Sequence, residues 1–392
     1  MKRVITLGLA GALCLTSCKK DEEANDTDDT TQTVTTVAED KANLTNSINN
    51  INECANELQA GKAMTLIKNM FHISQGESDE DQIEWMEPML DSLPSVFDFD
   101  AVLPDEGFVL NMTTHQGIYS YNEGTDEWAK TSGTNGTVEF LFPSANGGSN
   151  DLSLKISNYT GKSLNFDGED IDLPKTLNIL FKHNSDRIVE ITLNNAQYEE
   201  LQTVSIPTYV DLSVYVDPVE VTVLARKVNP TLLDLNIDIT TDGNCSMSSF
   251  AEVSLLSDDL ENLEDRDIDY VRGNVSFDDL VIESNVNVDV LAGMGDPTLN
   301  QINSMHTTEV FYNEIKVADL EYYESMESDS VFWGSNPNDF YIDYDYNENF
   351  EIIYKDGSKD MVKEAYLLPL LEDLEVTLFN LFGDWYQEED FI

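Results

Sequence analysis

From about residue 38, apolar residues recur at helical spacing. They follow one another at alternating intervals of four and three residues, as Leu44, Ile48, Ile51, Ala55 and Leu58. This spacing predicts an amphipathic helix. Gly61 interrupts it, a second apolar set extends the helical pattern to about Ile73, and a shorter amphipathic segment covers residues 83–93. We therefore expect a helical segment over residues 38–95 that packs on the remainder of the protein.

Beyond about Phe108 the period of the apolar residues falls to two, which is typical of β-strands. The predicted strands cover residues 108–112, 117–121, 138–142, 152–159, 177–182, 187–193, 209–216, 219–225, 232–239, 268–291, 307–320, 340–346 and 350–354. Short turns connect most of them, among them Asn122-Glu123-Gly124, Asp217-Pro218 and Asp356-Gly357. Consecutive strands without intervening helices predict an antiparallel sheet.

The end of the chain returns to helical spacing. The stripe consists of Val362, Tyr366, Leu370, Leu374, Leu378 and Phe382, with Pro369 at a start or a kink. Asp296-Pro297 is typical of a cap and first residue of a short helix that continues through Ile302. The predicted fold class is α+β and mainly β. Residues 96–392 form a large curved antiparallel sheet, with the N-terminal amphipathic helices and a C-terminal helix packed on one face.

The first 17 residues have the order of a secretory signal peptide. Lys2 and Arg3 precede an apolar run over residues 4–15, which is too short to span a bilayer. The run ends in Leu15-Thr16-Ser17-Cys18, which resembles the bacterial lipobox. The resemblance implies removal of residues 1–17 and lipidation of Cys18. The alternative is an ordinary signal peptide with an incidental cysteine. Each buried methylene of an acyl chain contributes about 0.8 kcal/mol, so two or three chains on Cys18 would hold the protein to a membrane.

A charged tether follows the cysteine. Lys19, Lys20, Asp21, Glu22 and Glu23 resemble the surface-export signal of Bacteroidetes lipoproteins, which implies the outer membrane with the protein facing the exterior. The alternative is that these residues only begin a polar linker. Residues 18–37 have no apolar periodicity, and we expect them to be a disordered acidic tether.

The order of these parts resembles a broad group of Bacteroidetes lipoproteins of unknown function. The resemblance lies in the lipobox, the acidic tether, the Asn-rich helix pair and three further segments. These segments are Gly117-Ile118-Tyr119-Ser120-Tyr121 with Glu127-Trp128 returning, Asp267-Ile268-Asp269-Tyr270-Val271, and Tyr354-Lys355-Asp356-Gly357-Ser358. The resemblance covers most of the mature chain. It implies no activity, because no activity is known for the group.

The charge of the chain excludes one class of partner. Lys and Arg number 21 against 75 Asp and Glu, which gives a formal charge of −54. Nucleic-acid binding needs clustered cations, so DNA and RNA are excluded as partners. At 41% hydrophobic residues the chain can still form a substantial core, and we expect one large domain or two joined ones.

Calcium is the most reasonable metal hypothesis, because hard cations prefer clustered oxygen ligands. One candidate set is Asp339, Asp343, Asp345 and Glu348, and a second is Asp258, Asp259, Glu261, Glu264, Asp265, Asp267 and Asp269. Neither set has the spacing of an EF-hand loop, and the alternation around Asp343 also fits a solvated strand face. The sequence otherwise implies no cofactor.

Cys54 and Cys245 are the thiols that remain after processing and lipidation. In an oxidising compartment they could form a disulfide, and closing so long a loop would stabilise the fold by about 3 to 5 kcal/mol. Two unpaired buried cysteines are the alternative.

No catalytic motif is present. His72, His115, His183 and His306 are isolated in sequence, and carboxylate pairs are too abundant to single out a hydrolase site. We predict a non-catalytic binding or carrier role for a hydrophobic small molecule or lipid. The alternative is a structural, adhesion or surface-glycan module, in which Trp85, Trp128, Trp333 and Trp385 could stack on sugars if exposed. An acidic-residue hydrolase comes third.

Overall fold

The computed structural model describes residues 35–70, 89, 112–132, 136–166, 169–200, 205–243, 245–260, 263, 265–294, 297–332, 340–362 and 365. The predicted signal peptide, the lipidated cysteine with its charged tether, most of the segment at 83–93 and most of the C-terminal stripe lie outside these residues.

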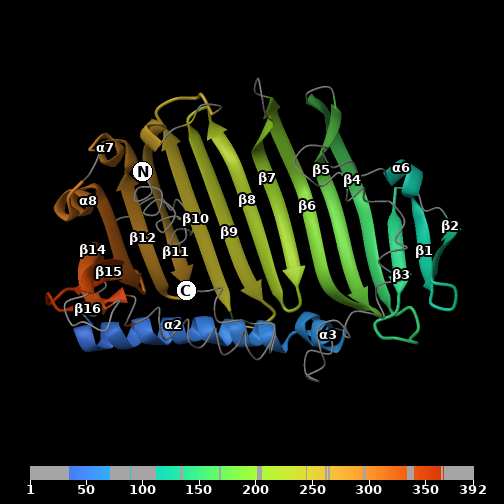
Figure 1. Cartoon of the computed structure of the whole chain (residues 1–392), viewed down its shortest axis with the longest axis horizontal. Helices are drawn as coiled ribbons and strands as arrows, with labels where there is room; N and C mark the ends of the chain where they lie inside the picture. Colours follow the sequence, from blue (N-terminus) through green and yellow to red (C-terminus); the bar gives the residue numbers. More distant parts are fainter. Residues whose placement is uncertain are drawn as a thin grey trace, which may run out of the picture. The chain divides into compact units, whose positions relative to one another are not determined.

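The chain is mainly β, as predicted. The described strands are hydrogen-bonded to one another in a single sheet of sixteen strands (Figure 1). The strands are β1 (Gly117–Asn122), β2 (Glu127–Ser132), β3 (Val138–Phe142), β4 (Leu152–Phe166), β5 (Glu169–His183), β6 (Asp186–Glu200), β7 (Ser205–Val216), β8 (Val219–Asn229), β9 (Leu232–Thr241), β10 (Ser246–Leu255), β11 (Ile268–Phe277), β12 (Leu280–Asn287), β13 (His306–Tyr312), β14 (Ile315–Phe332), β15 (Phe340–Tyr354) and β16 (Lys359–Met361). From β16 to β3 each strand lies beside its neighbour in sequence.

The prediction of a wholly antiparallel sheet is wrong at one pair. β1 pairs with β2 antiparallel but with β3 parallel, in the register Gly117 to Val138 and Tyr119 to Phe140. The reason is the strand order, in which β3 lies beside β1 and β2 occupies the edge. A chain that reverses into β2 and reverses again before β3 enters β3 in the direction of β1.

The described residues fall into two compact units. The first, called the β1–β9 unit, contains residues 52–229 and 233–247. The second, called the β10–β16 unit, contains residues 35–51, 230–232 and those from 248 onward. The helices are α2 (Val37–Ala60), whose residues belong to both units, α3 (Lys62–Met70) and α6 (Met112–His115) in the first, and α7 (Val288–Gly293) and α8 (Leu299–Met305) in the second.

In the β1–β9 unit, α3 is attached at the turn between β7 and β8 (Figure 1). The buried carboxylate of Asp217 accepts a hydrogen bond from the Lys62 backbone N–H at 2.7 Å, which satisfies one of the free donors at the start of the helix. Its other oxygen accepts the Tyr215 hydroxyl at 3.1 Å. Gly61 lies so close to the Asp217 carbonyl that a Cβ there would overlap it.

The last turns of α2 are linked to the turn between β9 and β10 by a disulfide and a hydrogen bond. A disulfide joins Cys54 to Cys245, with 5.5 Å between their Cα atoms. Beside it, the Thr241 hydroxyl donates to Glu57 Oε2 at 2.5 Å. A Cβ at Gly243 would overlap this carboxylate. The disulfide spans 191 residues of sequence, so in the chain-entropy model it removes much of the freedom of the unfolded chain.

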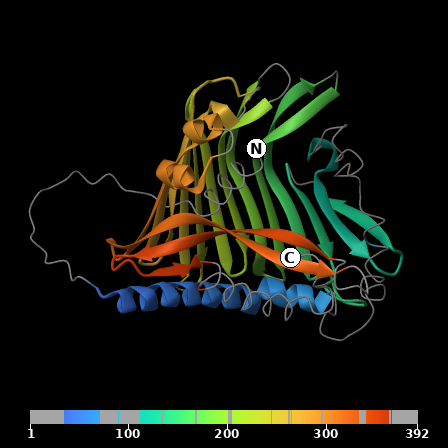
Figure 2. The same ribbon diagram turned by 60° about the vertical axis from the view of Figure 1, so that its left-hand side comes forward.

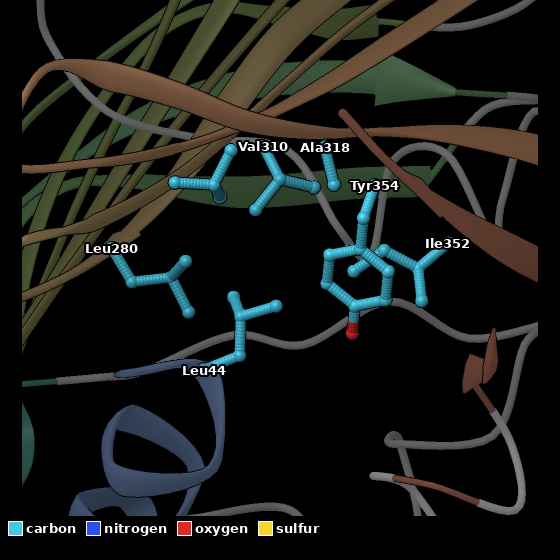
Figure 3. Close-up of a cluster of buried hydrophobic side chains, with 7 residues drawn as sticks. Leu44, Leu280, Val310, Ala318, Ile352 and Tyr354 are labelled. Atoms are coloured by element: carbon cyan, nitrogen blue, oxygen red, sulfur yellow. The ribbon is translucent and has the colours of Figure 1, made fainter. Parts of the chain in front are cut away.

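The β10–β16 unit has its own apolar core, which the first part of α2 covers. Leu44 packs against Leu280, Val310 and Ile352 from three strands (Figure 3). Near the start of α2, Lys355 forms an ion pair at 2.9 Å with Asp40, a carboxylate that is 0% exposed. A carboxylate removed from water in this way needs its cation, so the pair orients the helix on the turn between β15 and β16.

Two predictions in the β10–β16 unit are wrong in detail. The strand group predicted over residues 268–291 consists of β11 and β12 and ends at Asn287, whose side chain accepts the Val290 N–H at 3.2 Å and starts α7. The cap expected at Asp296-Pro297 is Thr298, which forms a capping box with Gln301. In both places a polar side chain near the helix start satisfies free backbone N–H groups. At Asn287 this outweighs the local strand propensity, and at Thr298 it moves the start of the predicted helix by one or two residues. Figure 2 shows α7 and α8 at one end of the strands and the first part of α2 at the other.

Asp217→Ala tests the attachment of α3. Loss of the cap and of the partner of Tyr215 should lower the free energy of unfolding by about 1 to 2 kcal/mol, measured by urea denaturation. Asp242→Ala, an exposed carboxylate in the turn between β9 and β10, is the matched control and should change stability by less than about 0.5 kcal/mol. Equal effects of the two substitutions would contradict the capping role.

Candidate functional site

Alternate residues of β3–β8 form continuous aliphatic and aromatic rows that cross six strands. The register aligns one row as Phe140, Leu154, Phe181, Val189, Val216 and Val219. The next row is Val138, Ile156, Ile179, Ile191, Val214 and Val221. A third row runs over β5–β8 as Leu177, Leu193, Leu212 and Val223. Side chains of one strand alternate between the two faces, so all three rows lie on the same face of the unit.

A bulge keeps a fourth row on this face. Leu193 pairs with Leu212, the register then shifts, and Ala196 pairs with Val210, which itself pairs with Ala225. Leu193 and Ala196 are three positions apart and would lie on opposite faces of a regular strand. The extra residue of the bulge restores the alternation, so the apolar side chains continue on one face.

The rows are buried at one end and half-buried at the other. On β3 and β4, Val138, Phe140 and Ile156 are at most 1% exposed, and they pack around Met112 of α6. On β6–β8 the corresponding side chains are half-buried, apart from Ala196, which is 2% exposed. We call this second part the aliphatic face, and it consists of Ile191, Leu193, Val210, Leu212, Val214, Val221, Val223 and Ala225.

Met112 also corrects an expectation. The strand predicted over residues 108–112 lies outside the described residues except for Met112, which begins α6, where the Gln116 N–H donates to its carbonyl at 2.9 Å. The apolar side chain of Met112 can be buried in the same core from a helix or from a strand. The spacing of apolar residues therefore does not distinguish the two conformations here.

The opposite side of the same strands is mainly polar, with Leu180 and Leu224 among its residues, and several of its polar groups are paired. Glu190 accepts hydrogen bonds from Asn178 at 2.9 Å and from Arg187 at 3.0 Å, and these hold the pKa of its carboxyl below the usual value, in spite of partial burial. The Arg187 guanidinium lies 3.5 Å from the ring centre of Tyr215. Burial, together with the charge of Asp217, raises the pKa of the Tyr215 phenol. This side therefore satisfies several of its own polar groups.

The chemistry available on the aliphatic face is contact with hydrocarbon. Three adjacent strands span roughly 10 Å between the outer two, and a row of residues recurs about every 6.6 Å along each strand. None of its eight residues carries a polar side chain. Each methylene that leaves water against such a surface contributes about 0.8 kcal/mol. The face is suited to an extended or branched apolar chain.

The residues predicted for other sites are placed as follows. Cys18 and the export segment Lys19–Glu23 lie outside the described residues, as does Asp339. Cys54 and Cys245 are joined in the disulfide described above, so the alternative of two free thiols does not apply in this structure.

Asp343, Asp345 and Glu348 lie on β15. The register places an acidic residue of β14 directly opposite each of them, and these are Asp329, Glu327 and Glu324. Among the residues whose side chains the structure describes, no three His, Cys, Asp or Glu are grouped to hold a metal ion. The calcium site stays a prediction.

Trp128 is the tryptophan that falls within the described residues. Its indole Nε1 donates to the Met89 carbonyl at 3.1 Å, and its ring packs against Tyr121 and Phe140 with centroids 5.4 Å apart. Trp128 is partly buried, and these contacts pack it against the core of the β1–β9 unit. It is therefore not arranged as an open platform for a sugar ring.

A buried row of three hydrogen-bonded polar side chains in the β10–β16 unit has no signal in the sequence. Thr308 lies between His306 Nε2 at 2.7 Å and the Ser284 hydroxyl at 2.8 Å, and all three residues are buried. The ring of His306 also packs on Phe350, with 6.0 Å between centroids. Burial lowers the pKa of the His306 imidazole. Only the register, which aligns Ser284 with Thr308, brings these separated residues together.

In the described part of the chain, no helix is long and apolar enough to cross a membrane. Comparisons with protein-family models, with curated proteins and with solved structures found no match to this chain.

His306 should make stability depend on pH. Its pKa is lowered in the folded protein from 6.5, so the unfolded chain binds the proton more readily. Its contribution is therefore complete above pH 6.5 and decreases as the pH falls below 6.5 toward the folded pKa. In His306→Gln, urea unfolding between pH 5 and pH 8 should show a smaller loss of stability at acid pH than the wild type. His183→Gln, at a partly exposed histidine, is the control. An unchanged pH profile in His306→Gln would show that the imidazole is not responsible.

Proposed function

We propose that this chain is a lipid-anchored outer-membrane lipoprotein, facing the cell exterior, which holds a hydrophobic small molecule or lipid against the aliphatic face without catalysing a reaction. The anchor is the lipid on Cys18, and the residues between Cys18 and the start of α2 at Val37 are the tether that separates it from the folded part.

The aliphatic face is the observation that carries the proposed binding role. Eight aliphatic side chains on three neighbouring strands are half-buried among the described residues. In the same unit, Val138, Phe140 and Ile156 of the same rows on β3 and β4 are at most 1% exposed and pack in a core cluster of the chain itself. Contiguous apolar surface on a highly charged protein is typical of an interaction site, because it is costly to leave in water.

The sequence at the N-terminus supports the proposed location. The lipobox-like Leu15-Thr16-Ser17-Cys18 and the following lysine-acid segment both occur at the positions where such signals act. The formal charge of −54 keeps the folded part away from anionic headgroups, so the acyl chains supply the attachment. A structural or adhesion role is the alternative. The core position of Trp128 gives the glycan version of that alternative no support.

Cys18→Ser tests the anchor. Serine lacks the sulfur that carries the lipid, so the variant should move from the membrane fraction to the soluble fraction. Cys14→Ser, a substitution inside the apolar run, is the matched control and should leave fractionation unchanged. The proposed anchor is wrong if the Cys18→Ser protein still sediments with membranes. Digestion of intact cells by added protease distinguishes an exterior from a periplasmic location.

Val214→Asp tests the aliphatic face. A carboxylate in the middle of the face should weaken binding of a neutral fluorescent hydrocarbon probe at least tenfold, which corresponds to about 1.4 kcal/mol. Ser213→Asp places the same group on the opposite side of β7, one residue away, and should bind the probe as the wild type does.

Leu212→Ala provides a second variant without a charge, in case Val214→Asp does not fold. This substitution removes apolar contact area. It should lower the affinity for the hydrocarbon probe severalfold and leave the circular dichroism spectrum unchanged. Native mass spectrometry of the detergent-extracted protein then reads the acylation and any bound ligand in one spectrum. Equal binding by Ser213→Asp, Val214→Asp and the wild type would refute the proposed site.

A further inference from the structure

The last turns of α2, residues 52–60, lie in sequence between two helical segments that are better buried. Before them, Leu44 and Ser47 are at most 5% exposed, and after them Ala63 and Leu66 of α3 are buried to the same degree. Among the described side chains of residues 52–60, none is fully buried. Burial therefore holds the segments on either side more firmly than the last turns of α2.

The sequence of α2 does little to favour a helix by itself. The helix contains six asparagines, which favour a helix interior less than alanine does. Its last turn has no basic side chain, whereas Glu57 places a negative charge near the carbonyl end of the helix. The helix dipole is also negative at this end, so the charge is unfavourable there. The helical form of residues 52–60 thus depends on contacts with the rest of the β1–β9 unit.

The contacts described for these residues meet at one place, the turn between β9 and β10. Cys54 and Glu57 are three positions apart, so they lie on the same side of the helix. Cys54 is bonded to Cys245, and the Glu57 carboxylate accepts the Thr241 hydroxyl and lies against Gly243. The disulfide is the covalent link of this group, and it keeps the Glu57 carboxylate at the turn.

The turn itself is closed by hydrogen bonds that do not involve the helix. The Thr241 N–H donates to the Cys245 carbonyl at 3.1 Å, and the Cys245 N–H donates to the Thr241 hydroxyl at 3.3 Å. These two bonds join the two sides of the turn whether or not the sulfur atoms are bonded. Loss of the disulfide would therefore act on the helix rather than on the strands.

From these observations we propose that the disulfide of Cys54 with Cys245 is a redox switch for the last turns of α2. The oxidised pair keeps residues 52–60 helical, and in the reduced protein these residues lose their helical hydrogen bonds while the strands keep theirs. In the reduction the S–S bond breaks, and a dithiol supplies two electrons and two protons. The products are two protein thiols and the disulfide form of the reductant. The switch does not depend on a ligand of the aliphatic face.

Hydrogen–deuterium exchange of the lipidated full-length protein in detergent micelles, with and without dithiothreitol, tests the switch. Titration of two free thiols establishes that the reduction is complete. Amides of residues 52–60 should exchange at least tenfold faster in the reduced protein. Amides of residues 40–48 and 63–70 should change by less than twofold, because buried side chains hold these segments. The double variant Cys54→Ser, Cys245→Ser should show the pattern of the reduced protein without any reductant.

A cation at the end of α2 should oppose the effect of reduction. Ala60→Lys adds a positive charge at an exposed position beside the negative end of the helix dipole. In the reduced protein it should slow the exchange of residues 52–60 at least twofold. Ala42→Lys makes the same substitution at an exposed position near the start of α2, and it should leave this exchange unchanged.

Three results would overturn the switch. They are equal exchange of residues 52–60 in the oxidised and reduced proteins, a disulfide that dithiothreitol does not reduce in the folded protein, and faster exchange across the whole β1–β9 unit after reduction. The last of these would make the disulfide a link on which the entire unit depends. An equal effect of Ala60→Lys and Ala42→Lys would contradict the role of the helix end. If the double serine variant does not fold, the reduced wild type provides the test.

Discussion

The register of β5–β8 is the constraint on which the candidate site depends. Side chains alternate with a period of two, so a slip of one residue between neighbouring strands would exchange the two faces. In the observed register Leu193, Leu212 and Val223 share a row, while Thr192, Ser213 and Thr222 share the row behind it. A slip would expose the aliphatic row and would also break the hydrogen bonds of Asn178 to Glu190 and Thr192. Apolar contact and polar pairing thus favour the same arrangement.

The helices α2 and α3 are attached at turns between strands. In the β1–β9 unit, Asp217 caps α3, and the disulfide of Cys54 with Cys245 holds the end of α2. In the β10–β16 unit, Asp40 and Lys355 fasten the start of α2. These contacts order the strand ends through a few strong polar or covalent links. They leave the aliphatic side chains in the middle of β6–β8 half-buried, and the proposed ligand would complete their burial.

Most of the strands could be predicted, because alternation and turn residues are local signals. The turns at Asn122-Glu123-Gly124 and Asp356-Gly357 lie where the sequence places them. β10 was missed, since its residues are mostly small and polar and show no alternation. The strand pattern of the sequence extends into the start of α7, because so short a helix contains too few residues to show its period. Burial by the surrounding chain decides such short segments.

The sequence by itself determined the mainly β composition, the two N-terminal helices with their break at Gly61, the acidity of the chain and the aliphatic alternation of β7 and β8, because each depends on residues close together in the chain. Only the tertiary structure decided that β3 runs parallel to β1, that Cys54 meets Cys245, and that His306, Thr308 and Ser284 form one buried chain. It also decided that the apolar residues of three strands merge into one face. Each of these depends on which distant segments become neighbours, and that choice is made by the summed burial and pairing of the whole chain.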